Sequence, residues 1–492
     1  MKLSSLLSAA GLALPEGVRN DPEIIGVTAD SRTAGPGMLF VAVPGAKQDG
    51  RAFIPAAVGA GVAAVLVPDG TAPDRTGPDD GTLMIESADP RRALALMAAV
   101  LAGPQPERIV AVTGTNGKTS TVDFLRQIWS GMDRKAASFG TLGLIAPVEL
   151  PFEIPALTTP DPVTLARGLA ALRSVGVTDV ALEASSHGLD QRRLDGVRIT
   201  AAGFTNLTRD HLDYHGDIGT YRAAKMRLFD TLLPEGGVAA ANADMDRDTL
   251  EMLQEIARRR GLEVRLTGEQ GDAIRLVAQK FMPEGQRLML EAWGKSFDVT
   301  IALPGRFQAD NVMLAAALVT AECDGIDAVM AQLPHLRGVR GRMERAVTLS
   351  SGATVYVDYA HTPDALARVL DSLRPHAKGR LIVVFGAGGD RDRGKRPLMA
   401  HEAALRADVV IVTDDNPRNE DAAAIRRDVL DGAPEALEIG DRRAAIAAGL
   451  EMLKAGDVLL VAGKGHEQGQ TIAGVVHPFD DVGVVQSLAG AA

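Results

Sequence analysis

Short apolar runs alternate with helix-like segments over most of this chain, and that alternation limits the possible folds more than any other feature. From residue 354 onward the runs are TVYVD, RLIVVFG, DVVIVTD and DVLLVAG, separated by segments such as TPDALARVLDSL and KRPLMAHEAALRA. Between residues 107 and 244 the pattern returns in RIVAVTG, DVALEAS, ITAAGFTN and GVAAANAD. Such alternation is typical of a parallel sheet with helices on its faces. We therefore predict an α/β fold.

The 492 residues are too many for one hydrophobic core, so several domains are expected. Two apolar runs, MLFVAVPG and VAAVLVPDG, flank a helix-like segment near the N-terminus. A helical pattern over residues 91–101 ends in the proline-interrupted LAGPQPER, which is typical of a linker. We predict three domains: residues 1–104, 105–340 and 341–492. The Pro-, Gly- and Asp-rich residues 68–81 are expected to form a loop.

Charge, cysteine content and hydropathy exclude several classes of protein. The net charge is −11, from 63 acidic residues against 52 Lys and Arg, which disfavours the basic face that nucleic acid requires. Cys323 is the single cysteine, which excludes an internal disulfide and a cysteine-cluster zinc site. No apolar run approaches the roughly 20 residues that span a bilayer. We expect a cytoplasmic monomer that neither inserts in membranes nor binds nucleic acid.

The N-terminal MKLSSLLSAAGLAL resembles a signal peptide, because a lysine precedes an apolar stretch. Five of its residues nevertheless share one helical face: Leu3, Leu6, Leu7, Ala10 and Leu14. That periodicity favours an amphipathic helix of the mature protein.

Polar, glycine-rich or charged segments follow the predicted strands. The central strands are followed by TGTNGKTS, EASSHGLDQRR and TNLTRDHLDYHGD, and the C-terminal strands by DYAHTPD, GAGGDRDRGKR, TDDNPR and AGKGHEQG. In open α/β sheets, ligands bind beyond the carboxyl ends of the strands. The sequence therefore predicts a large active site between two α/β domains. GAGGDRDRGKR does not satisfy G-x-G-x-x-G, so we reject a dinucleotide site.

GTNGKTS lies between a predicted strand and a predicted helix. In that setting backbone N–H groups cradle phosphates, Lys118 reaches the terminal phosphates and Thr119 ligates Mg²⁺. The full Walker pattern is absent, because Val112 stands where its leading glycine would be. A glycine-rich turn before a helix is the alternative. The context favours an ATP-binding loop made of Gly114, Thr115, Asn116, Gly117, Lys118, Thr119 and Ser120.

This shortened phosphate loop resembles that of the Mur ligase family, which also includes folylpolyglutamate synthetases. Further motifs are similar to the MurE branch of that family and follow in order: TTPDP, EASSHGLDQRR, FTNLTRDHLDYHG with YRAAK, LPGRFQADN, RGRME, DYAHTPDAL, GDRDRGKRP, DNPR and GKGHE. The match covers essentially the whole chain, and ten motifs in order are far more specific than one. The resemblance implies an N-terminal uridine-nucleotide-binding α/β domain, a central P-loop ATPase-like parallel-sheet domain and a C-terminal Rossmann-like domain.

The resemblance also implies that Lys118, Glu183, His211 and Lys225 are catalytic. Thr119, Glu183, His211 and Lys225 would hold Mg²⁺, with Lys225 carbamylated by CO₂. A carbamate converts a cationic lysine into an oxygen donor, which Mg²⁺ prefers. From the residues alone, Lys225 has the spacing of an ordinary exposed helix residue. By the same reasoning, Glu183 could be solvated and His211 could cap or pack locally.

Two nucleotide sites are implied as well. The uridine-nucleotide substrate is expected at Ala29, Ser31, Ala46, Lys47, Gln48, Thr158, Thr159, Ser185, Gln191 and Arg193. Ala29 stands where the family usually has leucine. Besides the phosphate loop, the family would place Asn311, Arg342 and Asp358 near ATP. Individually, the uridine-site residues could instead be caps or loop residues.

The family's pocket for the acceptor amino acid maps onto residues at the C-terminal strand exits: Arg391, Asp415, Asn416, Pro417, Arg418, Gly463 and Glu467. meso-Diaminopimelate differs from lysine by a second amino-acid head and hence a distal carboxylate. A guanidinium binds a carboxylate through two charge-assisted contacts. We therefore expect Arg418, held by the turn at Pro417, to select meso-diaminopimelate. GKGHE alone is more often an ordinary turn than a site.

The resemblance implies ATP- and Mg²⁺-dependent addition of meso-diaminopimelate to the D-glutamate of UDP-N-acetylmuramoyl-L-alanyl-D-glutamate through an acyl phosphate. This reaction belongs to peptidoglycan precursor synthesis. Within the family, the alternatives are an L-lysine acceptor or a folylpolyglutamate synthetase. Outside the family, a phosphate-loop kinase or a simple NTP-binding regulator would explain GTNGKTS. Neither would explain the polar residues that follow the C-terminal strands.

Overall fold

The computed structural model describes residues 1–15, 20–45, 49–71, 82–282, 285–322 and 325–490. Residue contacts divide the chain into two compact units, Met1–Thr267 with Leu314–Asp324 and Gly268–Met313 with Gly325–Ala492. The domain limits predicted at residues 104 and 340 remain predictions. Cys323 and residues 72–81 of the predicted loop lie outside the described residues.

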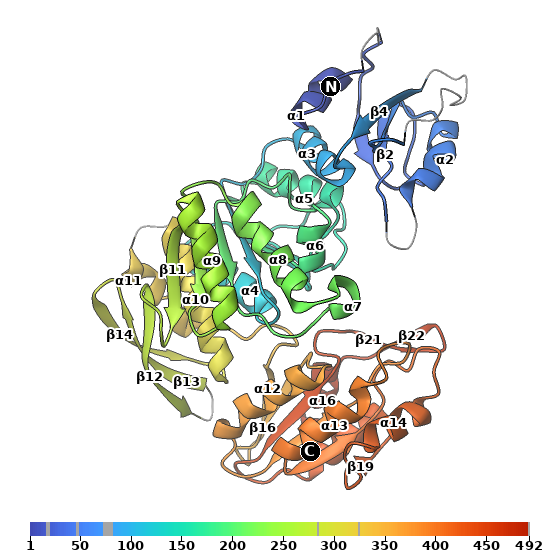
Figure 1. Cartoon of the computed structure of the whole chain (residues 1–492). Helices are drawn as coiled ribbons and strands as arrows, with labels where there is room; N and C mark the ends of the chain where they lie inside the picture. The colour runs from blue at the N-terminus through green and yellow to red at the C-terminus, as the bar shows by residue number, and fades with distance from the viewer. Residues whose placement is uncertain (16–19, 46–48, 72–81, 283–284, 323–324, 491–492) are drawn as a thin grey trace. The chain divides into compact units, whose positions relative to one another are not determined.

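The N-terminal part of the first unit is a four-stranded sheet in which every pair of neighbours is parallel (Figure 1). Its strands, in spatial order, are β1 (Gly26–Thr28), β2 (Met38–Val41), β3 (Ala64–Pro68) and β4 (Leu83–Ser87). Its helices are α1 (Leu3–Ala9), η1 (Gly50–Phe53), α2 (Ile54–Gly59) and α3 (Pro90–Ala102). Successive side chains of a strand face opposite sides. Leu39 accordingly packs with α1 and α3, whereas Phe40 packs with α2.

Helix α1 confirms the predicted amphipathic helix, because Leu3, Leu6 and Leu7 are buried. It is shorter than the predicted apolar stripe and does not reach Leu14. Gly11 has a φ of +72°, the left-handed conformation in which helices commonly end.

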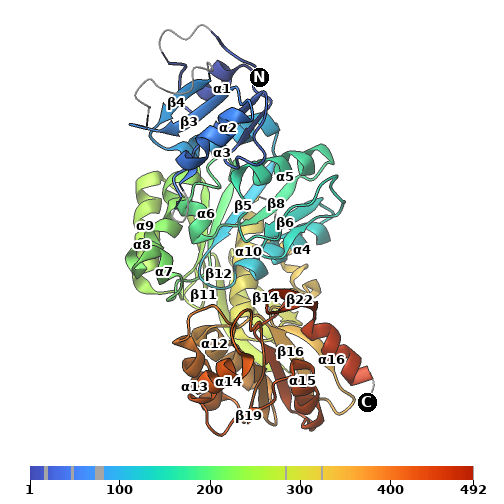
Figure 2. The ribbon, with the colours of Figure 1, turned by 90° about the vertical axis from the view of Figure 1, so that its right-hand side faces the viewer.

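The central part of the first unit is a mostly parallel sheet, as predicted (Figure 2). Its strands lie in the order β11-β10-β9-β5-β8-β6-β7, and only the β6–β7 pair is antiparallel. The strands are β5 (Arg108–Thr113), β6 (Ala136–Gly140), β7 (Gly143–Ile145), β8 (Asp179–Glu183), β9 (Ala201–Phe204), β10 (Val238–Asn242) and β11 (Glu263–Gly268). The helices are α4 (Lys118–Gly131), α5 (Pro162–Ser174), α6 (Ser186–Asp190), α7 (Leu212–His215), α8 (Ile218–Arg227), η2 (Leu228–Leu232) and α9 (Arg247–Arg260).

Burial explains why these strands are almost continuously apolar. All five residues of β8 are buried, as are the last five of β5. Strands of parallel sheets covered on both faces lack the polar alternation of half-exposed strands. Several helices begin at an aspartate whose side chain accepts a backbone N–H, including Asp161 at α5 and Asp246 at α9.

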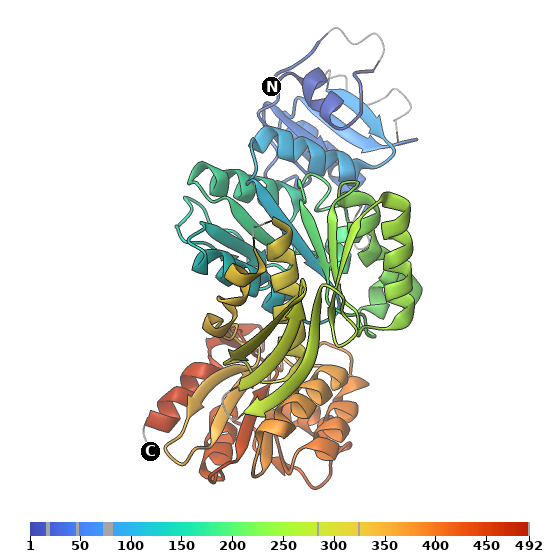
Figure 3. The same ribbon diagram turned by 90° about the vertical axis from the view of Figure 1, so that its left-hand side faces the viewer.

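The second unit begins with three antiparallel strands that the sequence analysis did not anticipate: β12 (Ile274–Met282), β13 (Gly285–Ala292) and β14 (Lys295–Ile301) (yellow-green in Figure 3). Helix α10 (Arg306–Glu322) passes from this unit to the first, and α11 (Ile326–Met330) and η3 (Leu333–His335) follow. His376 ties the antiparallel strands to the rest of their unit. Its Nδ1 contacts the Met282 carbonyl at 2.7 Å, and its Nε2 accepts a hydrogen bond from the Gly305 N–H at 3.0 Å.

The C-terminal part of the second unit is a sheet in the order β15-β16-β20-β17-β18-β19, parallel except for the β15–β16 pair. The strands are β15 (Glu344–Thr348), β16 (Thr354–Asp358), β17 (Leu381–Phe385), β18 (Val409–Val412), β19 (Leu437–Glu438) and β20 (Val458–Ala462). The helices are α12 (Pro363–Leu373), η4 (Arg374–His376), α13 (Lys395–Arg406), α14 (Ala422–Leu430), α15 (Arg442–Glu451) and α16 (Asp481–Gly490), and β21 (Gly469–Ile472) and β22 (Val475–Pro478) form a hairpin. The four apolar runs predicted here are strands β16, β17, β18 and β20.

Two hydrophobic cores cover the two faces of this C-terminal sheet. Val383 and Leu460 pack with α12 and α13 on one face, and Val384 packs with α15 on the other. In the part of the chain that the structure describes, no helix is both long enough and apolar enough to cross a bilayer.

We predict that Leu460→Ala lowers the free energy of unfolding of the second unit by about 2–5 kcal/mol, because Leu460 is fully buried in β20 and the truncation leaves a cavity. Urea denaturation followed by circular dichroism measures this loss. Leu405→Ala is the matched control, since Leu405 is 64% exposed in the same unit and its truncation should change stability by no more than about 0.5 kcal/mol. Equal effects of both changes would contradict this packing.

Candidate active site

The predicted phosphate loop joins β5 to the start of α4. Gly117 is the residue before the helix and has a φ of +87°, and Gly114 has a φ of +141°. A Cβ on Gly114 would lie 1.9 Å from the hydroxyl oxygen of Thr205, so only glycine fits there. Lys118 begins the helix, and its ammonium donates to the carbonyls of Gly114 and Thr115, both at 2.9 Å. The loop thus has the backbone and the cation of an anion-binding helix start.

Residues at the exit of β9 brace this loop. The N–H of Thr115 donates to the Asn206 carbonyl at 2.8 Å, and the N–H of Asn116 donates to Asn206 Oδ1 at 3.0 Å. Thr205 Oγ1 donates to the Asn116 carbonyl at 2.6 Å. Sequence reasoning did not single out Thr205 and Asn206. The only signal for them was their place in the polar TNLTRDH exit.

Lys225 is buried, so its interpretation as an ordinary exposed helix residue is wrong. It lies in α8 with 1% of its surface exposed, and its Nζ donates to the Gly114 carbonyl at 2.7 Å. The same ammonium lies 4.5 Å from the centre of the Tyr221 ring. Burial, followed by the nearby charge of Lys118, lowers the pKa of Lys225 well below its ordinary value. The carbonyl of Gly114 therefore accepts hydrogen bonds from two lysines.

Glu183 ends β8, which pairs with β5, and only 2% of it is exposed. Its Oε1 accepts the Thr141 N–H at 2.7 Å, and a Cβ on Gly140 would lie 2.0 Å from that same oxygen. The carboxylate is thus fixed in a backbone cradle. This burial excludes the alternative that Glu183 is a solvated surface acid.

His211 lies at the start of α7 with a φ of +52° and an exposed side chain. Its ring centre is 5.0 Å from that of His187 and 6.2 Å from that of Tyr221, the residue that also borders Lys225. Across the described ranges, no three His, Cys, Asp or Glu side chains are grouped closely enough to hold a metal ion. A metal at this place would need a further donor besides these residue types.

The structure brings together five of the residues predicted for the uridine-nucleotide substrate: Thr158, Thr159, Ser185, Gln191 and Arg193. Thr159 Oγ1 donates to the Glu183 carbonyl at 2.8 Å and lies 3.0 Å from Ser185 Oγ. Arg193 Nη1 donates to the Thr159 carbonyl at 2.6 Å, and its Nη2 donates to Gln191 Oε1 at 2.8 Å. Burial lowers the pKa of Arg193.

Ala29 and Ser31 follow β1, and within the described part of the chain no hydrogen bond joins them to this group. Ala46, Lys47 and Gln48 lie outside the described residues. Thr158 contacts the group through Thr141, whose hydroxyl is 3.0 Å from its own.

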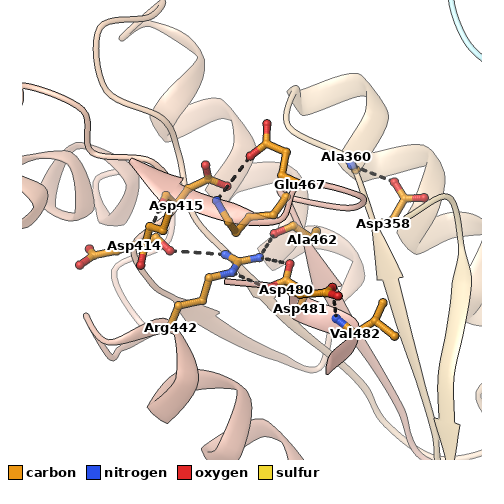
Figure 4. Close-up of polar contacts among 12 residues, drawn as sticks. Asp358, Ala360, Asp414, Asp415, Arg442, Ala462, Glu467, Asp480, Asp481 and Val482 are labelled. Atoms are coloured by element: carbon orange, nitrogen blue, oxygen red, sulfur yellow. Dashed lines mark hydrogen bonds and ion pairs between the residues drawn. The ribbon is translucent and has the colours of Figure 1, made fainter. Parts of the chain in front are cut away.

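In the second unit, the exits of β18 and β20 meet around a buried carboxylate. A Cβ on Gly463 would lie 2.6 Å from Asp415 Oδ2, and this buried oxygen has no hydrogen-bond partner in the described part of the chain. Asn416 Nδ2 donates to Glu467 Oε2 at 2.8 Å. Asp415 and Glu467 lie close together in Figure 4. An unpartnered buried carboxylate oxygen suits the ammonium group of a ligand.

Lys464 contacts two of the predicted acceptor-pocket residues, and sequence reasoning did not single it out. Its side chain is fully buried, and its Nζ donates to Asn416 Oδ1 at 2.9 Å and lies 3.4 Å from Glu467 Oε2. It therefore fixes the orientation of the Asn416 amide. The only signal was its place in GKGHE, where a lysine is usually exposed.

Arg418 is mounted by the β21–β22 hairpin as well as by the buried Pro417. Its N–H donates to the Thr471 carbonyl at 3.0 Å, and its own carbonyl accepts the Ala473 N–H at 2.6 Å. Its φ of +53° is rare for a residue with a side chain. The guanidinium donates through Nη1 to the Gly389 carbonyl at 2.7 Å. Arg391, which lies shortly after Gly389 in the chain, is exposed.

Asp358, Arg342 and Asn311, the residues expected near ATP, all belong to the second unit. The two Asp358 oxygens accept the N–H groups of Ala360 at 2.8 Å and Met343 at 2.7 Å, and burial raises the pKa of this carboxyl. The Arg342 guanidinium lies 4.4 Å from the centre of the Tyr359 ring. Asn311 is buried in α10, and no hydrogen bond among the described residues joins it to Arg342 or Asp358.

Comparison with known proteins agrees with this arrangement. Residues 23–111 match the Mur ligase family, catalytic domain; residues 112–319 match the Mur ligase middle domain; and residues 341–465 match the Mur ligase, glutamate ligase domain.

Two relatives carry the name UDP-N-acetylmuramoyl-L-alanyl-D-glutamate–2,6-diaminopimelate ligase. The protein of Caulobacter vibrioides is 53% identical over 475 residues, which cover 96% of this chain and 96% of that protein. The protein of Chelativorans sp. is 48% identical over 470 residues, covering 96% of this chain and 95% of that protein. A solved structure of a ligase with this name is 34% identical, with a TM-score of 0.72, and the match covers 100% of this chain and 99% of that chain. The chain therefore belongs to the Mur ligase family, which confirms the predicted family and the predicted three-part α/β fold.

Proposed function

We propose that this protein is the ATP-dependent ligase that joins meso-diaminopimelate to the D-glutamate of UDP-N-acetylmuramoyl-L-alanyl-D-glutamate in the cytoplasm. One structural observation carries the proposal: the buried amine of Lys225 shares the Gly114 carbonyl with Lys118 of the phosphate loop. A phosphate-loop kinase or a plain NTP-binding regulator gives no reason for a second, buried lysine there. The names of the relatives support the choice of substrates.

In the proposed reaction, the D-glutamate carboxylate attacks the γ-phosphorus of ATP, which forms an acyl phosphate and releases ADP. The amine of the acceptor then attacks the acyl carbon, phosphate leaves, and the amine proton is lost as the amide forms. Lys118 stabilises the charge on the transferred phosphoryl group, and the N–H groups at the start of α4 hold the phosphates. Phosphorylation is needed because a carboxylate is a poor electrophile at neutral pH.

Lys225 acts in this proposal as a carbamate. Its neutral amine adds to CO₂ and loses one proton, which gives an N-carboxylate with two oxygen donors. The lowered pKa of Lys225 favours this step, because only the neutral amine is nucleophilic. The carbamate would supply the extra donor that the described His and acidic residues lack. Thr119, Glu183, His211 and carbamylated Lys225 would then hold Mg²⁺, and three of these four residues supply the oxygen donors that Mg²⁺ prefers. When bound, Mg²⁺ neutralises phosphate charge.

The acceptor is proposed to bind in the second unit. The buried Asp415 carboxylate, with Asn416 and Glu467, would receive an ammonium group of meso-diaminopimelate, and Arg418 with Arg391 would receive its distal carboxylate. The N-terminal sheet with Ser31, together with the Thr159–Arg193 group, would hold the uridine nucleotide. Because each part of the chain is assigned a different ligand, we propose domain limits at residues 104 and 340. We also propose that the active protein is a monomer.

Lys118→Ala is expected to abolish ligation and leave the melting temperature nearly unchanged, because Lys118 is half-buried at the first position of α4 and contributes little core packing. Phosphate release and amide formation measure the activity. Lys135→Ala is the control, since Lys135 is an exposed lysine of the same unit. Near-normal turnover of Lys118→Ala would remove the loop from the mechanism.

Lys225→Ala is expected to lose most activity, because the carbamate oxygens are lost. Formate or acetate should restore part of it by filling the vacated donor position. At a fixed concentration of dissolved CO₂, enzyme stripped of CO₂ should regain activity faster as the pH rises through the lowered pKa of Lys225, since the neutral amine then increases. The Lys135→Ala control should not respond to formate. A fully active alanine variant would exclude the carbamate.

An acceptor screen with ATP and the UDP-linked dipeptide tests the substrate assignment. The native protein should use meso-diaminopimelate well and lysine poorly. Arg418→Ala should raise the KM for meso-diaminopimelate by an amount equivalent to about 2–4 kcal/mol, as expected when a desolvated charge pair loses one partner. The KM values for ATP and the dipeptide should change little.

Arg427→Ala is the matched control for this variant, because Arg427 is an exposed arginine of α14 in the same unit. If the native protein uses lysine equally well, or if Arg418→Ala loses both acceptors equally, Arg418 is not the selector.

A further inference from the structure

We propose that Arg442 is a positioning residue of the acceptor site, and that its ion pair with Asp481 lets the C-terminal helix α16 hold that site in shape. This inference rests on the proposed function, because it concerns the pocket for the acceptor amino acid. Neither residue was a candidate from the sequence, and neither touches the substrate in the proposed reaction.

Arg442 and Asp481 form a fully buried pair. Arg442 is the first residue of α15 and Asp481 the first of α16, and both side chains have 0% of their surface exposed. Arg442 Nε donates to Asp481 Oδ1 at 2.8 Å, and Nη2 donates to Asp481 Oδ2 at 2.7 Å. This two-pronged contact fixes the plane of the guanidinium.

The other side of the same guanidinium holds two backbone carbonyls at the site. Nη2 donates to the Ala462 carbonyl at 2.9 Å, and Nη1 donates to the Asp414 carbonyl at 3.4 Å (Figure 4). Ala462 ends β20 and precedes Gly463. Asp414 follows β18 and precedes Asp415. Since β17 lies between β18 and β20, no strand pairing joins these two exits directly. Arg442 therefore bridges them.

The spacing between the two exits matters for the acceptor. A Cβ on Gly463 would already lie 2.6 Å from Asp415 Oδ2, so the chain at Gly463 packs closely against the carboxylate proposed to receive the ammonium group. A small separation of the exits would move that oxygen relative to Lys464 and Glu467. A guanidinium in a rigid bidentate pair can prevent such a movement, and a flexible lysine cannot hold both carbonyls and the carboxylate together.

A buried ion pair could also serve stability alone, and the same sheet offers a control for that alternative. Arg380 and Asp457 join the opposite, amino ends of β17 and β20: the Arg380 N–H donates to Asp457 Oδ1 at 2.7 Å, and its Nη2 donates to Oδ2 at 2.8 Å. Breaking this second pair should weaken the same sheet without moving the acceptor site, because it lies at the far ends of the strands.

The test compares Arg442→Lys and Asp481→Asn with Arg380→Lys and Asp457→Asn in the full-length protein. Melting curves set an assay temperature at which every variant is folded. The first two variants should raise the KM for meso-diaminopimelate at least about tenfold, as expected when a buried charge pair is broken beside a binding site. Their KM for ATP, and the acyl phosphate trapped by hydroxylamine without acceptor, should stay within about twofold of native. Asp481→Glu, which keeps the charge, should recover part of the loss.

Several results would overturn the inference. The first is an unchanged KM for meso-diaminopimelate in Asp481→Asn, and the second is an equal rise in the KM values of all substrates. The inference also fails if the acyl phosphate is lost as much as ligation is, or if the Arg380 and Asp457 variants show the same rise in acceptor KM at an equal loss of melting temperature. If Arg442→Lys does not fold, Asp481→Asn and Asp481→Glu decide by the same measurements. Native protein that forms no amide with meso-diaminopimelate would instead refute the proposed function, which separates the two failures.

Discussion

Parallel pairing of strands is the constraint on which the candidate site depends. Neighbouring parallel strands end at the same edge of a sheet, so segments far apart in sequence become neighbours there. In the first unit this edge joins the phosphate loop after β5 to Glu183 at the end of β8 and Asn206 after β9. In the second unit it joins the exits of β18 and β20 around Asp415. The backbone register thus determines which polar residues meet before any side chain contributes.

Buried cations that donate to carbonyl oxygens recur at both edges. Lys225 donates to Gly114, Lys464 to the Asn416 side chain, and Arg442 to Ala462. Their electrostatic settings differ. Arg442 has the buried carboxylate of Asp481 beside it, whereas the hydrogen bond that the described residues give Lys225 is to a neutral carbonyl. Burial, with the nearby charge of Lys118, disfavours the charged form and lowers the pKa of Lys225, and a neutral amine is the form that adds to CO₂ in the proposed carbamylation.

The segment around Arg418 shows how a strand exit is held in one conformation by contacts from elsewhere in the chain. An isolated Asn-Pro turn would leave an arginine mobile. Here the edge of the β21–β22 hairpin pairs with the Arg418 backbone, Gln470 Nε2 donates to the Asp415 carbonyl at 2.7 Å, and the Thr471 N–H donates to Asn416 Oδ1 at 2.9 Å. These bonds stabilise a left-handed conformation that an arginine rarely adopts alone. The turn at Pro417 thus contributes only part of what holds the Arg418 backbone in place, and the β21–β22 hairpin that follows β20 contributes the rest.

The sequence alone determined the α/β class, four apolar strands in each of the central and C-terminal sheets, the glycine-rich loop before α4 and the family, because apolar runs, glycine turns and ordered motifs are local or additive signals. It indicated most candidate residues but not their environments, and it gave no warning of the antiparallel strands β12–β14. Only the tertiary structure decided that Lys225 is buried, that Lys464 contacts the Asn416 side chain, and that Arg442 bridges the exits of β18 and β20. The physical reason is that burial depends on partners distant in sequence: Lys225 contacts a carbonyl 111 residues away, and Arg442 pairs with a carboxylate 39 residues away. A lysine or arginine on a helix has the same local pattern whether that helix faces water or a second strand exit.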